Sequence, residues 1–249
     1  MARQKSIIKL QGTIGDISFY KSKDGYLARE KGGVDASRIA TDPAFARTRE
    51  NGAEFATSAS AGKLLRDTVR VLGKNASDSR VTARLTKIMS QIKNLDEANE
   101  RGERNIAEGI QTAAGKALLK GFNFNSNAVL GSVLYAPYAV DGDTGEIKVE
   151  ALSTQEELNY PQGATHVVFK SGFAVVDFAT GNSAMAVSAA QRLEISADDQ
   201  SVAVAPAEVP QIEGTKFILL CIEFVQEVNG NDYSLKNGMY NALSILEIA

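Results

Sequence analysis

Residues 217–228 read FILLCIEFVQEV, and they form the clearest β-strand pattern in the chain. Alternation places Ile218, Leu220, Ile222 and Phe224 on one face of such a strand, and Phe217, Leu219 and Cys221 on the other. A strand that is apolar on both faces is typical of the interior of a sheet, because each face then packs against another layer. We therefore expect this segment to run through the middle of a sheet.

The sequence around this strand repeats the pattern in shorter form. Alternating segments separated by Gly, Asn, Asp and Pro occupy residues 122–125, 130–140, 146–152, 166–170, 173–178, 184–188, 192–195 and 241–248. Residues suited to hairpin turns stand at 142–145 and 229–231. Short strands at this spacing are typical of an antiparallel β-sandwich, immunoglobulin-like or similar. The sequence therefore predicts a sandwich domain over residues 122–249.

The first half of the chain opens with a predicted β-hairpin. Residues 14–21 and 26–30 alternate around the turn 22–25, in which Asp24 and Gly25 can take the positive φ angles of a tight hairpin. An isolated hairpin is marginally stable in water, so its aromatic side chains need a surface. We expect Phe19, Tyr20 and Tyr26 to contact either the core of the chain itself or another subunit.

Three helices are expected after the hairpin, at residues 42–72, 75–94 and 104–120. Asp42 can cap the first of them and Pro43 suits its first turn. Gly52 and Gly62 predict a break or kink in it. The whole chain is thus predicted to be α+β, with a basic region of hairpin and helices over residues 1–121 and an acidic antiparallel sandwich over residues 122–249.

The net charge of −3 conceals two halves of opposite sign. Residues 1–121 hold 22 Lys+Arg and 14 Asp+Glu, a net charge of +8, whereas residues 122–249 hold 5 and 16, a net charge of −11. Such an asymmetry is expected where the basic half meets an anionic partner, or where it meets the acidic half of a neighbouring copy. Two separately solvated surfaces would give the same pattern.

The basic residues of the helices are the candidates for binding. They are Lys63, Arg66 and Arg70 in the first helix and Arg80, Arg84 and Lys87 in the second, where the spacing of four and three places the last three on one stripe. Clustered cations bind nucleic acid by neutralising phosphates, and they equally suit an acidic protein surface. The pI of about 5.4 and the absence of aromatic residues among these cations favour the protein partner. A simply solvated helix face is the third interpretation.

The sequence offers little for catalysis. One His and one Cys exclude a disulfide framework and a Cys/His zinc site within one chain. His166 and Cys221 both fall in predicted strands without partners for a catalytic dyad. The acidic run 141–146 lacks the ligand spacing of a calcium loop, and no phosphate-binding loop or dinucleotide fingerprint occurs. We expect no catalytic residue, no metal and no cofactor, and thus a protein that is not an enzyme.

No segment approaches the ~18 uninterrupted apolar residues of a membrane span. The apolar run at Ile7 and Ile8 is followed by a lysine and is too short for a signal peptide. The sequence therefore predicts a protein that folds in the cytoplasm without membrane insertion. Export by a secretion system that does not require a signal peptide is left open.

Three segments together resemble a family of uncharacterised bacterial proteins. They are residues 12–21 (GTIGDISFYK), 42–51 (DPAFARTREN) and 227–238 (EVNGNDYSLKNG), so that the resemblance extends over nearly the whole chain. The family is similar in its N-terminal hairpin and in its C-terminal EVNGxxYxLKNG motif. The resemblance implies that hairpin, helices and strand region belong together as one unit, and it implies no activity, cofactor or catalytic residue.

Together these patterns favour a structural subunit that associates with itself, its basic half against the acidic sandwich of the next copy. Opposite patches on one molecule build rings or filaments. The first alternative is a nucleic-acid-binding protein that uses the basic helical face. The second is a carbohydrate-binding or adhesive sandwich, with Tyr135, Tyr138 and Tyr160 as exposed contact residues.

Overall fold

The computed structural model describes residues 2–30 and 32–249. Its fold is α+β with antiparallel sheets, which confirms the predicted class. The chain divides into two compact units, Met1–Arg49 and Glu50–Ala249, and the boundary lies inside helix α2 (Ala46–Thr68). We describe each unit by itself.

The first unit contains a four-stranded antiparallel sheet in the order β1-β4-β3-β2. Its strands are β1 (Ala2–Arg3), β2 (Gly12–Ile14), β3 (Ile17–Ser22) and β4 (Gly25–Glu30). The predicted strand 14–21 is divided by a turn at Gly15, whose φ of +57° suits glycine. Strands β3 and β4 form the expected hairpin, although Gly25 alone, and not Asp24, takes a positive φ in its turn. Helices α1 (Ala36–Thr41) and η1 (Pro43–Phe45) follow, and Asp42 caps η1 as predicted.

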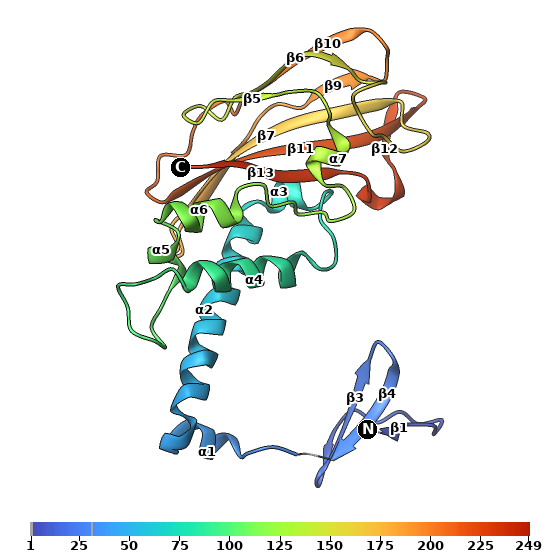
Figure 1. Ribbon diagram of the computed structural model, residues 1–249. Coiled ribbons are helices and arrows are strands. Elements are labelled where there is room, and N and C mark those ends of the chain that lie inside the picture. Colours follow the sequence, from blue (N-terminus) through green and yellow to red (C-terminus); the bar gives the residue numbers. More distant parts are fainter. Residues whose placement is uncertain (1, 31) are drawn as a thin grey trace. The chain divides into compact units, whose positions relative to one another are not determined.

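The second unit is organised around two long antiparallel strands, β7 (His166–Val176) and β11 (Thr215–Val228), which pair along eleven residues. Shorter strands flank them. Strands β8 (Ser183–Val187) and β9 (Gln191–Glu194) pair with β7, and strands β12 (Asn231–Ser234) and β13 (Ala242–Ile248) pair with β11. The segment 217–228 therefore lies in the middle of a six-stranded sheet, as its sequence predicts (Figure 1).

The two faces of β11 pack against different layers. Phe217, Leu219 and Cys221 belong to a core shared with the helices, whereas Ile218, Leu220, Ile222 and Phe224 belong to a second core on the opposite face. Every one of these seven side chains is almost completely buried. The alternation read from the sequence thus separates two cores, and the central sheet is covered on both faces.

The second core lies between the central sheet and a three-stranded sheet of order β10-β6-β5. Its strands are β5 (Ala139–Val140), β6 (Ile147–Ser153) and β10 (Asp199–Val204). This face-to-face packing is compatible with the predicted sandwich. Two predicted strands differ. Residues 122–125 lie against β13, with a bridge from Asn123 to Ser244 and backbone hydrogen bonds to Leu243 and Ile245, but they do not form a full strand. Residues 130–140 begin with the short helix α7 (Leu130–Val133). Asn123 also accepts hydrogen bonds from the Arg84 guanidinium of α4 through its backbone carbonyl and from the Leu130 amide of α7 through its side chain.

The helical layer covers the other face of the central sheet (Figure 1). It consists of α2, α3 (Arg70–Gly73), α4 (Val81–Lys93), α5 (Ile106–Gly109) and α6 (Ala113–Leu119). Instead of about three helices, the described residues therefore form seven α-helices in all, several of them a single turn. None of these helices is both long and apolar enough to cross a membrane.

The helix boundaries depart from the expected ones for steric reasons. Helix α2 runs through Gly52 and Gly62 without the predicted break. Gly62 is buried and faces Leu85 and Met89 of α4, so this part of α2 is held by its packing on the neighbouring helix. The first break comes instead at Val69. The expected third helix is divided before Thr112, whose side chain caps α6 by accepting a hydrogen bond from the Gly115 amide at 2.9 Å.

The expected division at Gly121 does not separate two cores. Leu65, Leu85 and Leu119 from the helices pack in one cluster with Phe217 and Leu243 from the strands. Residues 50–121 and 122–249 therefore form one unit, and the separate part of the chain is the N-terminal sheet.

Candidate binding surfaces

The predicted basic residues lie on helices α2 to α4 or at their ends. Lys63 is exposed and pairs with Asp67 of the same helix at 3.7 Å. Arg66 reaches from α2 to α4, where its Nη1 donates to Oγ1 of Thr82 at 2.5 Å. The remaining exposed cations are Arg70, Arg80 and Lys87. Five of the six predicted cations are thus on the surface or reach it.

Arg84 is the exception, because it is half-buried and structural. Its guanidinium pairs with Asp78 at 2.5 Å, donates to the carbonyl oxygens of Asn123 and Phe124, and lies 5.1 Å from the ring of Phe122. The prediction that Arg84 belongs to a binding stripe is therefore not supported by its position: it joins α4 to the segment that enters the strands.

Asp78 is held ionised at this junction. Burial acts to raise its pKa, but hydrogen bonds from the Ser126 and Arg80 amides and from Arg84 outweigh burial and lower the pKa to about 2. Its negative charge is paired within the fold, so it does not repel an anion at the surface.

A second internal network surrounds Glu54 of α2, which sequence reasoning missed. Its carboxylate pairs with the buried Lys93 of α4, accepts from Arg104 Nε at 2.8 Å and from the Gly102 amide at 2.9 Å. The Arg104 guanidinium is the main cause that lowers the pKa of Glu54 to about 2, against the opposing effect of burial. Glu54 is a polar residue within an exposed helical stretch, so only the tertiary fold reveals that it is buried.

A groove of about 740 Å³ lies between α2 and α4. Its lining residues are Phe55, Ala59, Ser79, Thr82, Ala83, Thr86, Lys87, Ser90, Gln91 and Asn94. None of these residues is acidic, and Phe55 is 62% exposed. Lys87 is the predicted site residue that the groove contains. Phe55 is an aromatic side chain in the same groove, although it is not adjacent to a predicted cation in the sequence.

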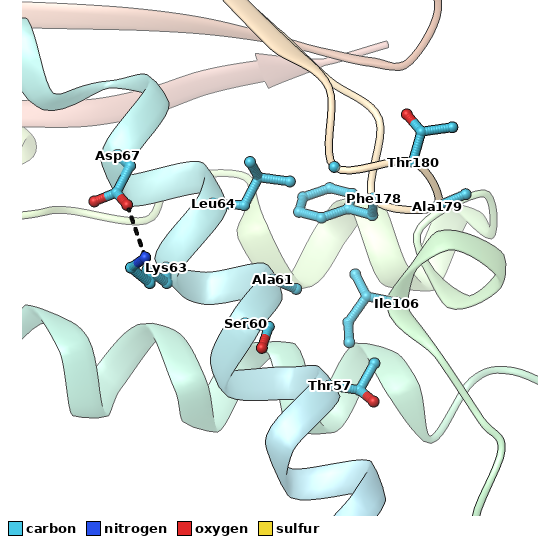
Figure 2. A pocket seen from close by; sticks show the side chains of 11 residues that line it. Thr57, Ser60, Ala61, Lys63, Leu64, Asp67, Ile106, Phe178, Ala179 and Thr180 are labelled. Carbon is cyan, nitrogen blue, oxygen red and sulfur yellow. Dashed lines mark ion pairs between the residues drawn. The ribbon is translucent and has the colours of Figure 1, made fainter.

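Two further hollows flank α2. Figure 2 shows one of about 450 Å³, where Leu64 points toward Phe178 of the β7–β8 turn and the Lys63–Asp67 pair lies at the edge. The other, of about 200 Å³, is lined by Arg66, Arg70, Lys74, Asp67, Ser77 and Phe124 among others. The first combines apolar side chains with hydroxyls, and the second has three cations and one carboxylate in its lining.

The predicted aromatic contacts of the N-terminal sheet divide between its faces. The register pairs Ile14 with Ile17, Phe19 with Ala28, and Lys21 with Tyr26, so one face carries the apolar side chains of Ile14, Ile17, Phe19, Tyr26 and Ala28. Lys21 and Glu30 lie at the two ends of the same face. Tyr20 and its partner Leu27 lie on the opposite face. No described residue of this unit is buried, and the exposed fractions of Ile14 and Ile17 are 62% and 46%. Phe19 and Tyr26 therefore belong to one apolar face and Tyr20 does not.

The single histidine and cysteine have different surroundings. Cys221 is completely buried, and burial raises the pKa of its thiol, which makes it an inert core residue. His166 lies with Glu227 and Asp232, and their ligand atoms are within 4.8 Å of one another. Arg192 already pairs with both carboxylates, at 3.0 Å for Asp232. A metal ion would have to compete with this guanidinium, so the cluster is an ion-pair network across strands.

The tyrosines proposed for carbohydrate contact are not equivalent. Tyr135 and Tyr138 are exposed, whereas Tyr160 packs against the second core. Tyr160 is therefore not the exposed contact residue that was expected.

Comparison with known proteins gave no match to a family model, to a curated protein or to a solved structure. The resemblance to a bacterial family stays a prediction, and the functional argument rests on the surfaces described above.

Proposed function

We propose that this protein is a non-enzymatic structural subunit that associates with itself head to tail. The observation that carries the proposal is the uncovered apolar face of the N-terminal sheet. Ile14, Ile17 and Phe19 lie side by side on this face, and no described residue of the unit is buried. A contiguous exposed apolar patch on a sheet marks an interaction surface.

A sheet of this kind gains little stability from its own residues. Small sheets require an apolar face packed on another layer, and here the outer strands β1 and β2 have only two and three residues. A hollow of about 560 Å³ beside Ile17 and Ala28 gives a partner side chain a place on the same sheet. The sheet is thus suited to be covered by a partner.

The charge distribution supports a second copy as this partner. The first unit holds 10 Lys+Arg and 5 Asp+Glu, a net charge of +5, so the rest of the chain has a net charge of −8. Lys21 and Lys9 lie near the ring of Tyr26, at 5.6 and 6.0 Å from its centroid, so cations border the apolar face. The acidic surface of residues 122–249, with 5 Lys+Arg against 16 Asp+Glu, is the complementary partner.

Contact between different patches of identical subunits is heterologous, and it produces a closed ring or an open filament. We also propose that residues 122–249 form an immunoglobulin-like or similar β-sandwich. The packing of the three-stranded sheet on the central sheet supports this description.

Light scattering coupled to size exclusion, at several protein and salt concentrations, tests the proposal. The mass is expected to grow with protein concentration and to fall as salt screens the charges. Ile14→Lys should abolish association, because it places a charge on the apolar face. Thr13→Lys is the matched control, since it adds the same charge on the other face of β2 and should leave association intact. A wild-type monomer at all concentrations in low salt would overturn the proposal.

A further inference from the structure

We propose that the groove between α2 and α4 binds single-stranded nucleic acid. The groove lies wholly within the second unit and is distinct from the apolar face of the N-terminal sheet. This proposal is therefore independent of self-association, and each can fail without the other.

The chemistry of the groove suits a phosphate backbone. Hydroxyl groups come from Ser79, Thr82, Thr86 and Ser90, amides from Gln91 and Asn94, and a cation from Lys87. Hydroxyls and amides donate to phosphate and sugar oxygens without reading sequence, and lysine neutralises the phosphate charge. Because no acidic side chain lines the groove, nothing within it repels a polyanion.

Further cations border the groove and remain available. Arg66 is held at its wall by Thr82, and Arg80 follows Ser79 in the chain. Within residues 2–30 and 32–249, no ion pair involves Arg66, Arg70, Lys74, Arg80 or Lys87.

The carboxylates of the same helices are already neutralised. Asp67 pairs with Lys63, Asp78 with Arg84, and Glu54 with Lys93 and Arg104. The fold thus leaves Lys87 in the groove and Arg66 and Arg80 beside it without an ion pair among the described residues, while Arg70 and Lys74 line the neighbouring hollow. This is a local positive field on a chain with a net charge of −3.

Phe55 favours a single strand over a duplex. Its ring is 62% exposed at the groove, between small residues that leave room for a base. Aromatic side chains beside a basic groove stack on unpaired bases, whose faces a duplex conceals. Helix α4, with 13 residues, extends over about 20 Å, which is sufficient for a few nucleotides.

Fluorescence anisotropy with a labelled oligothymidylate of about 15 nucleotides tests the proposal on the full chain at about 50 mM salt. Wild-type protein should bind, and its affinity should fall as salt rises. Phe55→Ala should weaken binding by at least about fivefold through lost stacking. Lys87→Ala should weaken it about three- to tenfold and reduce the salt slope by roughly 0.7, the loss of one phosphate contact.

Lys63→Ala is the matched control, because Lys63 is an exposed cation of α2 that lines the hollow of Figure 2 instead of the groove. It should bind like wild type, and circular dichroism should show all three variants folded. Absence of salt-dependent binding by the wild type would overturn the proposal, as would equal losses in Lys63→Ala and Lys87→Ala or an unchanged affinity in Phe55→Ala. Displacement of the oligonucleotide by polyglutamate at equal charge concentration would assign the groove to an acidic protein instead.

Discussion

The central sheet and the N-terminal sheet are both antiparallel and both built from alternating strands, but they differ in what covers them. Strand β11 has helices against one face and a second sheet against the other, so the six consecutive apolar side chains from Phe217 to Ile222 are buried, and so is Phe224. Strands β3 and β4 have no buried residue. The sequence pattern of a strand thus indicates which of its faces must pack against another layer. Whether the same chain provides that layer depends on the rest of the fold.

The largest loss of stability is expected when a covered face of the central sheet loses a large side chain. Phe217→Ala should lower the free energy of unfolding of the second unit by about 3–5 kcal/mol, because it leaves a cavity between the helices and the central sheet. Phe19→Ala, on the uncovered face of β3, should lower the free energy of unfolding of the first unit by less than about 1 kcal/mol. Urea denaturation gives both values, and equal losses would contradict the difference in cover.

The Glu54 network tests how the helical cover is held. Glu54→Gln leaves Lys93 buried without its counter-charge and should cost about 3 kcal/mol at neutral pH. The pKa of Glu54 is lowered from 4.5 to about 2, so its ionised form stabilises the fold above pH 4.5 and this contribution is lost as the pH falls toward 2.

Urea denaturation at a series of pH values checks this sign. The wild-type free energy of unfolding should decline between pH 4.5 and pH 2 by about 2–3 kcal/mol more than that of Glu54→Gln. Parallel curves for the two proteins would show that Glu54 does not hold α2 in the way described.

Alanine substitutions at two glycines of the helical layer should change the free energy of unfolding by smaller amounts and in opposite directions. A Cβ on Gly109 would lie 2.1 Å from the Ile92 carbonyl oxygen, so Gly109→Ala should destabilise the fold by about 1–3 kcal/mol.

A Cβ on Gly52 meets nothing within 4 Å, and Gly52→Ala should stabilise α2 by about 0.5–1 kcal/mol. Thermal unfolding should therefore shift downward for the first variant and slightly upward for the second. A loss of stability in Gly52→Ala would mean that this helix face is already occupied.

Much of the fold could be predicted where the pattern is local. The alternation of residues 217–228 identifies the central strand and both of its faces, and Asp42 and Pro43 mark a helical start. The domain boundary could not be predicted, since a change from helical to strand pattern near Gly121 does not show that Leu119 and Leu243 share a core. The predicted break or kink near Gly52 or Gly62 is wrong, because the sequence does not show that Gly62 is buried against α4.

The candidate sites were predictable to a lesser extent. Clustering of lysines and arginines indicates a basic surface, but only the fold shows that Arg84 is bound internally by Asp78 while Lys87 stays in a groove. Phe55 is distant in sequence from Lys87, so their proximity along the groove required the packing of α2 on α4.

Hydrogen–deuterium exchange at low and high protein concentration tests most directly whether a second copy covers the N-terminal sheet. We predict that the amides of β3 and β4 become more protected as concentration rises, whereas those of β7 and β11 are strongly protected throughout. Equal protection of β3 and β4 at every concentration would contradict the account.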